Sequence, residues 1–147
     1  MGLYMRAVIT SWPGHEFAEL VAFMGEQDAG FVVSGSDWAD FEIHDARGAV
    51  VLAADLTVGD EVREELAEEL EFLADLEGTP AARQKVEAHL ATASAVVGMQ
   101  ILMSRYDESV AAANQLITFL ERSPGVLTQV DTVGWYDGEE LILQESE

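Results

Sequence analysis

The stretch FEIHDARGAVVLAAD, residues 41–55, decides the fold class. Over residues 41–44 apolar and polar side chains alternate, which is typical of a strand with one buried face. Residues 45–48 are turn-forming and end in a glycine, and the nearly all-apolar run 49–54 indicates a returning strand near the centre of a sheet. The stretch therefore predicts a β-hairpin.

The elements around this hairpin recur later in the chain in the same order. They are preceded by a strand, a helix and a short strand at about 6–11, 17–25 and 31–33. A second series has a strand at about 96–103, a helix at about 107–121 and three short strands at 126–130, 132–136 and 140–144, the last two joined by Asp137-Gly138. We therefore predict an α+β fold with two pseudo-repeated strand-helix-strand-strand-strand units, about 5–55 and 96–145, that form an antiparallel sheet.

The segment between the two units, about 58–92, is rich in glutamate and predicts an acidic helical hairpin that joins them. Its first helix is expected over 59–77, with apolar residues at helical spacing: Val62, Leu66, Leu70 and Leu73. Thr79-Pro80 resembles a helix cap followed by a proline in the first turn, which predicts the second helix. The whole chain, residues 1–147, is expected to form a single domain, because each unit alone buries little surface.

The composition restricts both the chemistry and the partners. The 147 residues include 28 acidic and 7 basic side chains, a net charge of −21, and no cysteine. Disulfides and thiolate ligands are therefore excluded, and the charge disfavours direct binding to nucleic acids or anionic membranes. A general acidity of the source proteome is the alternative explanation of the charge. The N-terminal apolar stretch is too short for a signal peptide or a membrane span, so we expect a cytoplasmic protein.

The sequence contains no strong catalytic or metal-binding motif. His15, His44 and His89 lie far apart and lack the spacing of paired metal ligands. There is no nucleophile elbow, phosphate-binding loop or dinucleotide fingerprint. We therefore expect a protein that is not an enzyme and that needs neither a metal nor an organic cofactor.

The acidic helix is the main functional signal. Its glutamates lie outside the apolar stripe, where like charges at neighbouring positions repel one another and reduce helix stability. A solvated surface is the alternative interpretation of such a charge run. Two tryptophans in predicted turns add aromatic surface of the kind found at binding hot spots. The predicted partner-binding residues are Glu61, Glu64, Glu65, Glu68, Asp75, Trp12 and Trp38.

Two functional hypotheses follow. The first is an immunity- or inhibitor-type protein that neutralises a basic toxin or nuclease by protein–protein contact, because opposite charge speeds association and adds specificity. The alternative is a small-molecule-binding or regulatory module with a groove between the two pseudo-symmetric halves. A homodimer is compatible with either hypothesis.

Overall fold

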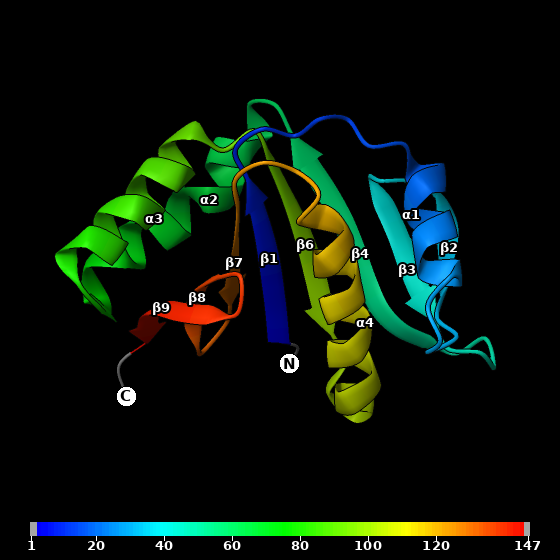
Figure 1. Ribbon diagram of the computed structural model, residues 1–147. Helices are drawn as coiled ribbons and strands as arrows, with labels where there is room; N and C mark the ends of the chain where they lie inside the picture. The colour runs from blue at the N-terminus through cyan, green and yellow to red at the C-terminus, as the bar shows by residue number, and fades with distance from the viewer. Residues whose placement is uncertain (1–2, 146–147) are drawn as a thin grey trace.

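The computed structural model describes residues 3–145 and is built around one sheet. The sheet has nine strands in the order β2-β3-β4-β6-β1-β7-β8-β9-β5 (Figure 1). Every strand pair is antiparallel, which confirms the α+β class and the antiparallel sheet. The strands are β1 (Leu3–Ile9), β2 (Val32–Asp37), β3 (Asp40–His44), β4 (Val50–Val58), β5 (Leu76–Glu77), β6 (Ala95–Ile101), β7 (Val126–Val130), β8 (Gly134–Asp137) and β9 (Glu140–Glu145).

Four α-helices lie within the part of the chain that the structure describes. They are α1 (Phe17–Gly25), α2 (Glu61–Phe72), α3 (Pro80–Thr92) and α4 (Tyr106–Leu120), with short 3-10 helices at Leu73–Asp75 and Met103–Arg105. The start of α3 agrees with the sequence prediction, because the hydroxyl of Thr79 accepts a hydrogen bond from the main-chain N–H of Ala82 at 3.0 Å. No described helix has the length and apolar character that crossing a membrane requires.

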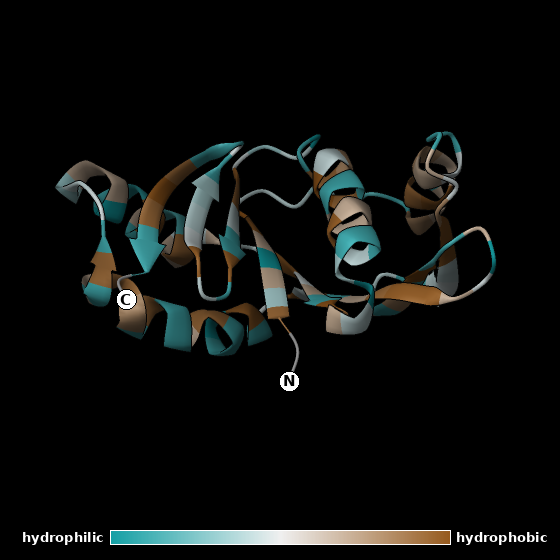
Figure 2. Ribbon diagram, turned by 90° about the horizontal axis from the view of Figure 1, so that it is seen from below, coloured by the Kyte–Doolittle hydropathy of each residue, from teal (hydrophilic) through white to brown (hydrophobic). Residues whose placement is uncertain are grey.

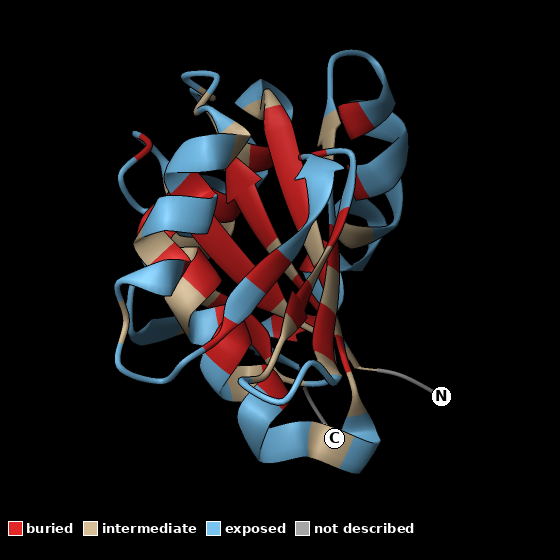
Figure 3. Ribbon diagram, turned by 90° about the vertical axis from the view of Figure 1, so that its right-hand side faces the viewer, coloured by how far each residue is buried: buried red, intermediate tan, exposed pale blue. Residues whose placement is uncertain are grey.

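The helices cover both faces of the sheet, which Figure 2 shows nearly edge-on. Along β1, side chains alternate between the faces: Ala7 and Ile9 pack in a core with α1 and α4, whereas Val8 packs in a second core with α2 and α3. Figure 3 shows that buried residues concentrate in the central strands, while the outer sides of the helices are exposed. The protein is therefore a three-layer structure with a core on each side of one sheet.

The structure does not confirm the predicted pseudo-repeat. Both α1 and α4 join two parallel-running strands, but β1 and β2 are separated by β6, β4 and β3, whereas β6 and β7 are separated by β1 alone. As a result α1 packs on β2 and α4 packs on β4 and β6, so the two helices neighbour each other instead of occupying equivalent places. On the side of α4, none of the described helices covers the strands β7 and β8 (Figure 1).

The connector also differs from its prediction. The helix expected over 59–77 ends at Phe72, and the chain continues through a 3-10 helix into β5, which pairs with β9. Leu70 is 48% exposed and does not belong to the buried stripe. At about 3.6 residues per turn, positions 62, 66, 69 and 73 share one side of the helix, so Glu69 takes the inward place that was expected for Leu70. A carboxylate is thereby turned towards the sheet.

Candidate functional site

The outer side of α2 carries the acidic residues predicted from the sequence. Because Val62 and Leu66 are buried, Glu61, Glu64 and Glu68 fall on the opposite, solvent-exposed side. Glu65 and Asp75 are exposed as well, the latter in the 3-10 helix that follows α2. Five of the seven predicted binding residues therefore lie on one continuous segment.

A cleft of about 390 Å³ lies between this helix and the strands β7 and β8. Strands β1 and β7 form its base, because Arg6 pairs in register with Gln129 and both side chains point to the face that carries α2. The lining residues are Arg6, Glu68, Glu69, Phe72, Leu76, Gln129, Asp131, Thr132, Gly134, Trp135 and Glu145. The lining of the cleft thus contains one basic residue and four acidic ones.

Arg6 contacts most of the polar side chains at the floor of the cleft. Its Nη1 donates to Oε1 of Gln129 at 2.8 Å and lies 3.1 Å from Oδ1 of Asp131. The same nitrogen is 3.3 Å from Oε1 of Glu69, and Nε is 3.8 Å from Oε1 of Glu65. Three carboxylates therefore surround a single guanidinium, which leaves this part of the cleft with a negative charge.

Glu69 is the least solvated of these carboxylates, with 12% of its side chain exposed. Burial raises the pKa of the Glu69 carboxyl, while the charge of Arg6 acts in the opposite direction. Its Oε2 atom is buried and has no hydrogen-bond partner among the described residues. Partial desolvation also raises the pKa of the nearby Asp55, and the charge of Glu65 raises it further. Both carboxyls are therefore protonated more readily than a solvated one, chiefly because they are partly buried.

An apolar wall completes the cleft. Phe72, at the end of α2, is 53% exposed, whereas Trp135, which also lines the cleft, is almost entirely buried. Thr132 lies in the turn at the rim and has a left-handed backbone, with φ of 68°, which is uncommon for a β-branched residue. Chemically, the arrangement suits a cationic group with an apolar stem, because acids and an exposed aromatic ring line the same cleft.

Trp12 and Trp38 lie away from this cleft, beside α1. Their rings meet edge-to-face with centroids 5.2 Å apart. The indole Nε1 of Trp38 donates to the carbonyl oxygen of His15 at 2.8 Å, and Trp38 is only 8% exposed. Trp12 is half-buried against the same core. The structure therefore does not bring the tryptophans together with the acidic residues, and little of Trp38 is left for a partner to contact.

His15 takes part in an arrangement that has the order of a serine–histidine–acid triad. Its Nε2 lies 2.9 Å from Oγ of Ser123, and its Nδ1 lies 3.8 Å from a carboxylate oxygen of Glu19. The second distance is too long for a hydrogen bond, and Ser123 is 5% exposed, so a substrate carbonyl has little access to Oγ. The geometry supports a structural role, in which His15 ties the start of α1 to the turn after α4.

Within residues 3–145, no group of three or more His, Cys, Asp or Glu side chains is placed to hold a metal ion. No model of a known protein family matches the chain, and neither a curated protein nor a solved structure matches it. The geometry of this chain is therefore the basis of the function proposed below.

Several residues of the cleft were missed by sequence reasoning. Glu69 falls among the acids outside the predicted apolar stripe, Gln129 lies in the predicted strand 126–130, and Asp131 lies between two predicted strands. The signal that was present is Arg6, the only charged residue in the strand Leu3–Ile9. A lone arginine inside an apolar strand indicates acidic neighbours, but the sequence does not say which of the 28 acids they are.

Proposed function

We propose that this protein is a non-enzymatic, immunity- or inhibitor-type protein that binds a basic partner, most simply a toxin or nuclease, through α2 and the adjoining cleft. The observation that supports the proposal is the acidic cleft beside α2, in which Arg6 is outnumbered by carboxylates and Phe72 is exposed. Neither feature is expected of a helix that serves only to connect two parts of the fold.

Charge on α2 would act mainly on the rate of encounter. The exposed row of Glu61, Glu64 and Glu68 presents negative potential to a cationic surface, and the effect extends over a Debye length of about 8 Å at physiological ionic strength. Rim charges of this kind change the association rate and its salt dependence more than the dissociation rate.

The cleft would supply the specific contact. A lysine or arginine of the partner would lay its stem along Phe72 and bring its charged head towards Glu68 and Glu69. Such a contact gives the buried Oε2 of Glu69 the donor that it lacks within the described chain. Aromatic residues are enriched at protein–protein interfaces, so the exposed Phe72 beside the cleft supports such a contact.

The test is a pull-down from the source cells followed by an activity assay of what is captured. We expect the wild-type protein to retain a basic protein and to inhibit its nuclease or toxic activity at a stoichiometric ratio. A triple variant, Glu61→Lys, Glu64→Lys and Glu68→Lys, should lose both capture and inhibition. Glu65 is left unchanged because it lies 3.8 Å from Arg6 and its reversal would disturb the cleft.

The matched control is Glu16→Lys, Glu26→Lys and Asp28→Lys, three exposed acids around α1 that give the same change in net charge. It should retain capture and inhibition. If both triple variants behave alike, the partner responds to net charge only and the proposed site on α2 is wrong. If the captured protein is not inhibited, the inhibitor function is wrong.

A further inference from the structure

The face of the sheet opposite the acidic cleft carries a second hollow. It is a groove of about 540 Å³ between α4 and the strands β7 and β8, at the place where none of the helices in residues 3–145 covers the sheet. Leu3 and Met5 from β1 and Val130 from β7 form its floor, and Val110 and Ile117 from α4 form one wall. This volume lies within the range of about 300–1,000 Å³ that is usual for small-molecule sites.

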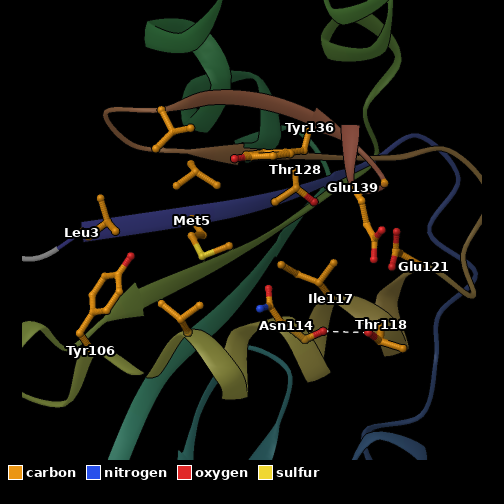
Figure 4. Close-up of a pocket in the computed structure, with 14 residues that line it drawn as sticks. Leu3, Met5, Tyr106, Asn114, Ile117, Thr118, Glu121, Thr128, Tyr136 and Glu139 are labelled. Atoms are coloured by element: carbon orange, nitrogen blue, oxygen red, sulfur yellow. Dashed lines mark hydrogen bonds between the residues drawn. The ribbon is translucent and has the colours of Figure 1, made fainter. Parts of the chain in front are cut away.

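The polar groups of the groove are unequally distributed along it. At one end Glu121, just after α4, and Glu139, in the turn between β8 and β9, point towards each other (Figure 4). Neither carboxylate belongs to any ion pair of the described residues. At the other end Tyr106, which is 47% exposed, directs its hydroxyl group towards the floor (Figure 4).

We propose that this groove binds a small amphiphilic amine, with its apolar body on the floor between α4 and β8 and its ammonium group between Glu121 and Glu139. The apolar floor disfavours a purely polar ligand, because such a ligand would lose hydrogen bonds to water there and find few partners in the protein. The two unpaired carboxylates select the sign of the head group, because a carboxylate or phosphate placed between them would be repelled.

Two further side chains of the groove could contact the body of the bound amine. The amide of Asn114 points into the groove from α4, and the aromatic ring of Tyr136 lies on the opposite wall (Figure 4). A ring on this wall favours an aliphatic or aromatic body and tolerates a nearby cation. The site is independent of the partner surface on α2, since it lies on the other face of the sheet.

The experiment uses three molecules of equal chain length: octylamine, octan-1-ol and octanoate. Protein labelled with ¹³C at the methionine methyl groups is titrated with each in 150 mM salt, a concentration on the order of physiological ionic strength. Met5 lines the groove and Met103 is exposed outside it, so their methyl resonances separate groove binding from general attraction to an acidic protein. We expect octylamine to shift the Met5 resonance saturably and octanoate to leave it unchanged.

The double variant Glu121→Gln, Glu139→Gln should bind octylamine about tenfold more weakly and octan-1-ol as before, because two ion pairs are lost while the apolar floor remains. Both residues are exposed, so the fold is retained. The matched control, Glu140→Gln, neighbours Glu139 but does not line the groove and should leave both affinities unchanged. The absence of a saturable Met5 shift, equal binding of octanoate, or unchanged octylamine binding by the double variant would each overturn the proposal.

Discussion

The Oε1 atom of Glu69 on α2 lies 3.3 Å from Nη1 of Arg6 on β1, while its Oε2 atom is buried without a hydrogen-bond partner among the described residues. The pair therefore joins helix and sheet but leaves part of the carboxylate uncompensated. Breaking the ion pair or protonating Glu69 changes the free energy of unfolding, because the charged carboxylate is incompletely solvated.

The burial of Glu69 predicts how the stability of the protein depends on pH. Burial raises the folded-state pKa of Glu69, so as pH falls from 7 towards 4.5 the folded protein takes up a proton before the unfolded chain does, and protonation stabilises the folded state. In urea unfolding, the wild type should therefore gain stability relative to Glu69→Gln over this interval. A constant difference between the two proteins across the interval would contradict the shift.

His89 predicts a pH effect of the opposite sign. Its Nε2 lies 2.7 Å from the carbonyl oxygen of Val8, which can only accept, so the nitrogen carries the proton and donates it. Burial lowers the pKa of His89, so below about 6.5 the unfolded chain binds the proton more readily and the folded state loses stability. Relative to His89→Gln, the wild type should become less stable as pH falls from 7 to 5.5. An increase would show that the buried ring is charged.

Gly134 is expected to tolerate no side chain. Its φ is 141°, and a Cβ atom there would overlap the carbonyl oxygen of Leu143 on β9 and lie 2.9 Å from Cα of Gln144. Gly134→Ala should therefore lower the free energy of unfolding by about 2 kcal/mol or more. The matched control is Gly25→Ala at the end of α1, which has open space and an ordinary φ and should be neutral or slightly stabilising. Equal effects would contradict the close approach of β8 and β9.

Repulsion along α2 predicts that one charge reversal stabilises the protein. Glu68 has glutamates at positions 64, 65 and 71, so Glu68→Lys replaces three repulsive pairs with attractive ones and should raise the free energy of unfolding by about 1 kcal/mol at low salt. The gain should shrink as salt is added. Glu87→Lys on α3, with Arg83 four residues earlier, should gain nothing. A stabilisation that does not respond to salt would point to another cause.

Folding is expected to proceed without a metal. The chain has no cysteine, and its histidines lack paired ligand spacing. Treatment with a chelator should therefore leave the melting temperature unchanged, as measured by circular dichroism. A fall of several degrees, restored by a defined metal, would reveal a structural ion.

The hairpin at residues 41–55 and most other strands could be read from the sequence, because alternation and turn residues act over short distances. The places of the strands in the sheet could not. The two series have the same order along the chain, yet β4 pairs with β6 and β7 pairs with β1, so the equivalent strands do not take equivalent positions. Which strands pair depends on contacts between distant segments, which local patterns do not specify.

Composition and the local spacing of apolar and polar residues were enough to predict the α+β class, the strong negative charge, the lack of cysteine and the exposed acids Glu61, Glu64, Glu65, Glu68 and Asp75. The folded structure was needed to show that Glu69 faces Arg6, that Trp38 is buried, and that the sheet face beside α4 forms a groove ending in Glu121 and Glu139. These relations join residues far apart in the chain. Their physical cause is the packing of helices on particular strands, which is set by the whole core.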